Sequence, residues 1–156
     1  ALSPVSSTLE ELNLADSRLN AVPVLGGLAK LTQLNLLHNK IHTVPEGIFE
    51  KLPRLRNLRL ESNLICSMSP IALNETKPTL ELLDISGNCF SAVPSLALLN
   101  AKRFMLLYLT TNKITDLAPL ALMNLPRLLE LRLSDNLLSR LHPLSSRTLP
   151  SSSSSI

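Results

Sequence analysis

Aromatic residues are scarce in this sequence, and their scarcity limits how the core can be built. Only 3% of the 156 residues are aromatic and tryptophan is absent, although 45% are hydrophobic. A core of this composition has to be filled by leucine and other aliphatic side chains rather than by aromatic rings. The length corresponds to a single domain.

Cysteine is nearly absent as well. The two cysteines, Cys66 and Cys89, are too few for a disulfide framework. They fall at different positions of the repeat described below, so we expect them to lie in different columns of the fold and to remain unpaired. So little cysteine favours a reducing compartment, and the sequence therefore predicts a cytoplasmic location.

Long apolar runs and strong charge imbalance are also missing. No stretch approaches the ~18 consecutive apolar residues of a membrane-spanning helix, and the N-terminus lacks the basic-then-apolar layout of a signal peptide. The 15 basic and 12 acidic residues leave a mild excess of +3 that is scattered along the sequence. We therefore expect no membrane insertion and no nucleic-acid partner. The start at Ala1 is interpreted as that of a mature form or a fragment of a longer protein.

Residues that carry chemistry do not form a recognisable constellation. His38, His42 and His142 have no cysteine or carboxylate at metal-ligand spacing, and His38 and His42 are expected to be solvated turn residues. Gly26-Gly27 lacks the lysine and third glycine of a phosphate loop, and no Gly-x-Ser-x-Gly nucleophile motif occurs. The sequence predicts no enzyme, metal site, cofactor or small-molecule substrate.

What the sequence does contain is a sixfold repeat. Leucine or an equivalent residue recurs at places 1, 4, 6 and 11 of each copy, with asparagine at place 9. The intervals between copies are 22, 24, 25, 24 and 24 residues, which is the periodicity of a solenoid. The six copies begin at Leu9, Leu31, Leu55, Leu80, Phe104 and Leu128.

The copies agree closely with one another. The second has Leu31, Leu34, Leu36, Asn39 and Ile41 at the five defining places. The first copy departs from the frame, because Ser17 stands where asparagine is expected. Six copies in register are not a chance pattern.

This frame resembles the leucine-rich repeat family over residues 9–144. The resemblance implies a curved, right-handed solenoid of the α/β class, with a concave parallel sheet of about six short strands. The convex segments would be irregular, 3-10 or short helical. The copies with Val-Pro after place 11 resemble the typical 24-residue repeat, and the fifth copy resembles the phosphatase-regulator type. Residues 1–8 would form an N-terminal flank or partial cap, and the serine-rich residues 145–156 a disordered tail.

Place 9 has an expected structural role. An asparagine amide both donates and accepts hydrogen bonds, so it can satisfy the backbone where the chain turns away from the strand. Stacked copies would form a ladder of asparagines, consisting of Asn39, Asn63, Asn88, Asn112 and Asn136.

Function is expected on the solvent-facing strand residues. Places 4 and 6 point into the core, so places 3 and 5 point away from it. Apolar groups and the single tyrosine gather there and at place 2 in copies four to six, which predicts an exposed patch that binds a protein partner. The predicted partner-binding residues are Arg59, Leu82, Asp84, Met105, Leu106, Tyr108, Leu129 and Arg132.

The sequence therefore favours a non-catalytic, monomeric scaffold within a larger protein. One alternative is a fragment of an extracellular receptor-type ectodomain, favoured by the glycosylation sequon at Asn74. Cysteine-rich caps, common in extracellular members of the family, are missing. Another alternative is a targeting or regulatory unit of an enzyme such as a phosphatase or kinase.

Overall fold

The computed structural model describes residues 3–117, 125–138 and 140–141. Its main feature is a parallel sheet of six short strands, in the order β1-β2-β3-β4-β5-β7. These strands are β1 Glu11–Asn13, β2 Gln33–Asn35, β3 Asn57–Arg59, β4 Leu82–Asp84, β5 Leu106–Tyr108 and β7 Glu130–Arg132. Each strand occupies places 3 to 5 of one copy. The sheet is therefore built from one strand per repeat.

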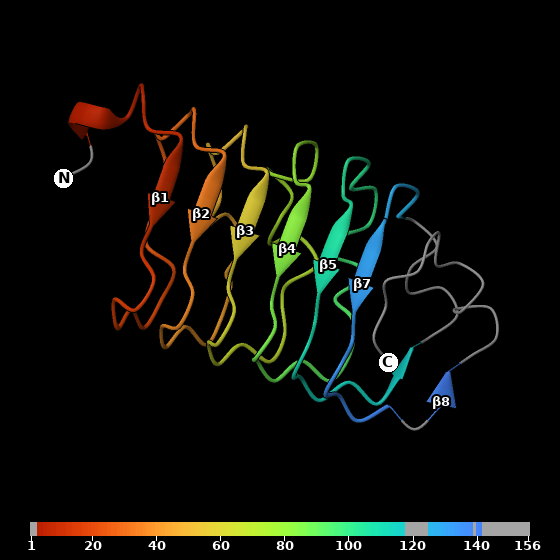
Figure 1. Ribbon diagram of the computed structural model, residues 1–156. Coiled ribbons are helices and arrows are strands. Elements are labelled where there is room, and N and C mark those ends of the chain that lie inside the picture. Colours follow the sequence, from red (N-terminus) through yellow and green to blue (C-terminus); the bar gives the residue numbers. More distant parts are fainter. Residues whose placement is uncertain (1–2, 118–124, 139, 142–156) are drawn as a thin grey trace.

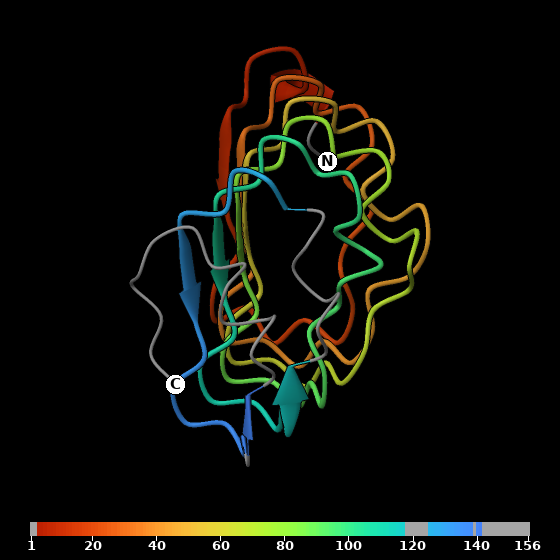
Figure 2. The same cartoon turned by 90° about the vertical axis from the view of Figure 1, so that its right-hand side faces the viewer.

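Strands stack without any shift in register. Equivalent places pair throughout, as in Leu34 with Leu58 and Leu58 with Leu83. Figure 1 shows the strands side by side, and Figure 2 shows the coils superposed along the solenoid axis. The predicted leucine-rich repeat solenoid is confirmed, and the connecting segments are turns. The only helix in the described residues is η1, a 3-10 turn at Ser3–Val5.

The core is the stack of apolar places inside the coils. Leu31, Leu34, Leu36 and Ile41 of the second copy are each at most 1% exposed. The first copy differs, since its four leucines at the same places are only partly buried. A coil inside the stack is covered on both sides, whereas the first coil is covered on one side only.

Place 8 has a left-handed backbone in every copy. The values of φ are 55° at Asp16, 53° at His38, 54° at Ser62, 67° at Gly87, 56° at Thr111 and 56° at Asp135. Only Gly87 adopts this conformation without a steric cost. The site is also tight, because a Cβ on Gly87 would lie 3.2 Å from the backbone N of Ser62.

The asparagines at place 9 follow this left-handed residue and join successive coils. Asn63 is typical: Nδ2 donates to Leu36 O of the preceding coil at 3.0 Å and to Leu60 O of its own coil at 3.1 Å. Its Oδ1 accepts the backbone N–H of Ile41 at 3.1 Å. The same three contacts recur at Asn39, Asn88, Asn112 and Asn136. Asn39 also accepts the backbone N–H of Ser17, so it serves the first coil, whose own place 9 lacks an asparagine.

The prediction that the two cysteines remain unpaired is wrong. Cys66 and Cys89 form a disulfide, with their Cα atoms 4.4 Å apart. Beyond the asparagine turn, the N–H of place 10 donates to the carbonyl of place 11 in the preceding coil. Cys89 N donates in this way to Ile65 O at 2.9 Å. This diagonal offset puts place 10 of the fourth copy, Cys89, beside place 12 of the third copy, Cys66. Residues of different columns are therefore in contact.

A second, smaller sheet was not predicted. It consists of β6 Asp116–Leu117 and β8 Arg140–Leu141, which pair in parallel near the last coils (Figure 1). The serine-rich tail and His142 lie outside the described residues.

Candidate functional site

The outward-facing strand residues, at places 3 and 5, make up the concave face of the sheet. At its β5–β7 end, Tyr108, Glu130 and Arg132 form what we call the aromatic cluster. The hydroxyl of Tyr108 donates to Glu130 Oε1 at 2.7 Å. Arg132 Nε donates to Glu130 Oε2 at 2.9 Å, and its guanidinium lies 4.3 Å from the centre of the Tyr108 ring. Three side chains from two adjacent strands are thus held in one arrangement.

The charges of the aromatic cluster are fixed by these contacts. Partial burial of the phenol, followed by its hydrogen bond to Glu130, raises the pKa of Tyr108 above its ordinary value. The hydrogen bond that Arg132 donates to Glu130 raises the pKa of Arg132 as well. Tyr108 is therefore a neutral donor and Arg132 a cation at physiological pH.

Apolar side chains surround the aromatic cluster. Leu129 is 53% exposed, and Met105 and Leu106 are half-buried. The structure brings these three together with Tyr108 and Arg132, because Leu106 and Tyr108 pair with Glu130 and Arg132 across the β5–β7 ladder. Tyrosine, methionine and arginine are enriched at the centres of protein interfaces.

The prediction that Leu82 and Asp84 belong to the exposed patch is wrong. They are only 6% and 8% exposed. Asp84 lies on β4 between the longer side chains of Arg59 and Tyr108, and Leu82 lies between Asn57 and Leu106. The register was predicted correctly, but both side chains are buried between the neighbouring strands.

Asp84 has structural partners instead. Its Oδ1 accepts the N–H of Ser86 at 3.0 Å, and its Oδ2 lies 3.8 Å from Arg59 Nη1. Glu61 lies in the same region, and burial together with the charge of Asp84 raises the pKa of Glu61 although Arg59 opposes the shift. Among the described residues, Glu61 Oε1 is a buried oxygen without a hydrogen-bond partner. This group of charges is a source of electrostatic strain in the fold.

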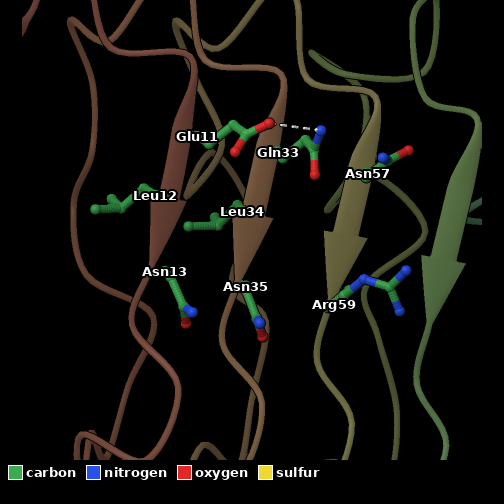
Figure 3. A pocket seen from close by; sticks show the side chains of 8 residues that line it. All are labelled: Glu11, Leu12, Asn13, Gln33, Leu34, Asn35, Asn57 and Arg59. Atoms are coloured by element: carbon green, nitrogen blue, oxygen red, sulfur yellow. Dashed lines mark hydrogen bonds between the residues drawn. The ribbon is translucent and has the colours of Figure 1, made fainter.

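The other half of the concave face is polar. A hollow of about 290 Å³ lies over β1, β2 and β3, and we call it the polar hollow (Figure 3). Its polar lining consists of Glu11, Asn13, Gln33, Asn35, Asn57 and Arg59. Gln33 Nε2 donates to Glu11 Oε1 at 3.0 Å. Of these residues only Arg59 was among the predicted site residues; the signal for the others was the run of amides at places 3 and 5 in copies one to three.

Other candidate groups lie away from the concave face. His38 contacts Asp16 of the preceding coil, a carboxylate neighbour that sequence spacing did not reveal, and both side chains are exposed. Asn74 is exposed, beside Lys77 and Lys102. Within the described residues no group of three or more His, Cys, Asp or Glu side chains could hold a metal ion. Within those same ranges, no helix has the length and apolarity to cross a membrane.

Comparison with known proteins agrees with this geometry. A family model described as leucine-rich repeat matches residues 7–65 and 102–154. The chain belongs to the leucine-rich repeat family. Leucine-rich repeat domains are generally protein-interaction modules rather than catalysts, so the concave face is the first place to seek a function in this leucine-rich repeat chain.

Individual relatives share parts of the chain. Leucine-rich repeat-containing G-protein coupled receptor 5 of Rattus norvegicus is 38% identical over 86 residues, covering 55% of this chain and 9% of that protein. Keratocan of Bos taurus is 30% identical over 122 residues, covering 73% of this chain and 32% of keratocan. A solved leucine-rich repeat protein of Leptospira interrogans matches with a TM-score of 0.78 and 30% identity, covering 95% of this chain and 37% of that one. This leucine-rich repeat chain therefore spans well under half the length of each of these relatives.

Proposed function

We propose that this leucine-rich repeat chain is the ligand-binding unit of a secreted or cell-surface protein, and that it binds a protein partner through the β5–β7 end of its concave face. The observation that carries the proposal is the aromatic cluster beside exposed Leu129. The contact residues are Arg59, Met105, Leu106, Tyr108, Leu129 and Arg132.

The aromatic cluster suits this role because it is already ordered. A partner that packs on Tyr108 and Arg132 does not have to immobilise them first, so little conformational entropy is lost on binding. Arg132 presents a planar cation that remains half exposed, at 50% of its side chain, while Glu130 holds it in place. A standard interface of ~800 Å² per partner would extend from this cluster toward the polar hollow, where amides supply hydrogen bonds.

An oxidising compartment is supported by the Cys66–Cys89 disulfide, because such bonds are rare in reducing compartments. The relative named as a receptor points the same way. The predicted cytoplasmic location receives no support from the relatives. We therefore prefer the extracellular alternative. The alternative of a regulatory unit for an enzyme has no specific observation in its favour.

The test is a binding comparison between matched variants. Proteins captured from secreted and cell-surface fractions by wild-type protein are compared with those captured by a Leu129→Glu, Arg132→Glu variant. The control is Leu96→Glu, Lys113→Glu, which makes the same chemical changes away from the aromatic cluster, and Leu96 is 62% exposed. We expect a partner that is retained by the control and lost by the first variant.

Two outcomes would overturn the proposal. Equal loss of the partner from both variants would place binding elsewhere on the molecule. Reduced thiols at Cys66 and Cys89 in protein isolated from its native source, measured by peptide mass spectrometry, would exclude the oxidising compartment.

A further inference from the structure

Basic residues gather along the edge of the solenoid where the chain enters each strand. Five turns make up this basic edge: residues 26–30, 50–54, 75–79, 99–103 and 125–127, along the upper edge in Figure 1. They carry seven of the 15 lysines and arginines but only two of the 12 acidic residues. Their net charge is +5, whereas the rest of the chain has a net charge of −2. The charge that is scattered in sequence is concentrated in space.

The repeat frame aligns these charges from coil to coil. Among copies two to six, the residue immediately before place 1 is basic in four, as Lys30, Arg54, Arg103 and Arg127. Lys77 lies two residues before the exception, Thr79. Because successive strands are ~4.8 Å apart, such a column presents cations at short, regular intervals along the solenoid axis.

These cations lack the partners that the concave arginines have. Arg59 is paired with Asp84, and Arg132 with Glu130. None of the seven basic residues of the edge forms an ion pair within the described part of the chain. Six are exposed and Lys77 is half-buried. The edge therefore has a positive potential that its two acidic residues, Glu50 and Glu75, offset only in part.

The middle of the basic edge is also hollowed. An open groove of about 590 Å³ lies between the third and fourth coils. Lys77, Lys102 and Arg103 line it, and the amides of Asn74 and Asn100 add hydrogen-bonding groups. Pro78 and Leu99 complete the lining. A groove with three cations and two amides suits an anion that also carries hydroxyl groups.

We propose that the basic edge binds a linear sulfated polysaccharide. Neither the edge segments nor their groove contains an aromatic residue on which bases could stack, and the three phenylalanines are buried in the core. Within the described ranges no helix longer than η1 is present to enter a major groove or lie on a membrane. The choice of polysaccharide also rests on the proposed extracellular compartment.

Heparin is the probe for the test, applied to the full chain with its disulfide intact. The edge variant is Arg54→Gln, Arg103→Gln, Arg127→Gln. The control is Arg18→Gln, Lys40→Gln, Lys113→Gln, which removes the same charge from place 10 at the opposite edge. Because charge-driven binding weakens with each lost cation, we expect the edge variant to bind heparin about 100-fold more weakly at 150 mM salt, and the control to change by about threefold or less. Thermal unfolding of all three proteins checks that they are folded.

Several results would overturn the proposal. Equal weakening in both variants would show that net charge alone attracts heparin. Undiminished binding to desulfated heparin would show that sulfate is not recognised. Tighter binding to duplex DNA, or to phosphatidylserine vesicles, would assign the edge to a nucleic acid or a membrane. The Leu129→Glu, Arg132→Glu variant should bind heparin within about threefold of the wild-type protein, allowing for its altered net charge. A failure of the concave-face proposal can therefore be distinguished from a failure of the polysaccharide proposal.

Discussion

Individual polar residues in this protein either hold the coils together or form the outer surface, and their hydrogen-bond partners distinguish the two roles. Asn88 donates to Leu60 O, Ile85 O and Ser86 O and accepts from Ile65 N. The hydroxyl of Tyr108 in contrast donates to Glu130 on the concave face and bonds to no backbone group in the described part of the chain. Asparagine at place 9 was predictable because backbone groups at a repeated turn need partners. The burial of Leu82 and Asp84 was not predictable, because it depends on the side chains of adjacent strands.

Replacing Asn88 should destabilise the protein far more than replacing Tyr108. Asn88→Ala leaves backbone groups of two coils without partners, so we expect the free energy of unfolding to fall by ~1–3 kcal/mol. Tyr108→Ala should leave folding nearly intact. Chemical denaturation measures both, and equal losses would contradict the assignment of the two columns.

Relieving the left-handed backbone at Thr111 should stabilise the protein. Thr111 is β-branched and has φ 56°, so Thr111→Gly removes a steric cost that exceeds the added entropy of the unfolded chain. We expect a gain of ~0.5–1 kcal/mol in unfolding free energy. Thr110→Gly, one residue earlier and outside the positive-φ region, should lower it instead. A loss at Thr111 would show that its backbone is not strained.

The charge of Glu61 should make stability depend on pH. Its pKa in the folded state is raised above 4.5, mainly by burial and also by Asp84. The folded protein therefore binds a proton that the unfolded chain has already lost, and the free energy of unfolding falls as pH rises from 4.5 through the folded-state pKa. Glu61→Gln should be more stabilising at pH 7 than at pH 4. Thermal melts at both values test this, and parallel pH profiles for the two proteins would contradict it.

At the scale of elements, each coil is joined to the next by three sets of contacts. The strand ladder keeps equivalent places together, the asparagine bridges the turn, and place 10 bonds diagonally to place 11 of the preceding coil. The diagonal contact brings Cys66 and Cys89 together between the third and fourth coils. Which strand side chains face the core follows from the alternation of side chains along a strand. The diagonal offset between coils depends instead on the shape of the turn.

The disulfide should stabilise the two coils that it joins. It closes a loop with a sequence separation of 23 residues, so the unfolded chain loses conformational entropy. Cys66→Ser, Cys89→Ser should lower the free energy of unfolding by about 3 kcal/mol. Reductant should have the same effect on the wild-type protein and none on the variant. Equal stability of oxidised and reduced wild-type protein would contradict the prediction.

The whole molecule is a one-dimensional stack, and its stability should vary along the axis. Leu58 in the third coil is fully buried, whereas Leu12 in the first is only partly buried. Each coil depends on its neighbours, so a coil with one neighbour is held less firmly than a coil with two.

Hydrogen exchange should reveal this gradient. Backbone amides of β3 and β4 should exchange more slowly than those of β1, by about a factor of ten or more, because β1 can open without disturbing the rest of the stack. Exchange measured by mass spectrometry on peptides from each coil tests this. Identical protection in all strands would instead indicate that the solenoid unfolds as one unit.

The sequence by itself determined the fold. Each repeat needs the leucine frame and its asparagine, and stacking the repeats builds the solenoid. It also predicted which strand side chains face outward, since strand alternation fixes the side of the sheet on which each residue lies. Only the tertiary structure decided two things: the disulfide, and the burial of Leu82 and Asp84. Both depend on contacts between different coils. The shape of the turns and the size of the neighbouring side chains set the distances between those coils, and the period of the repeat encodes neither of these.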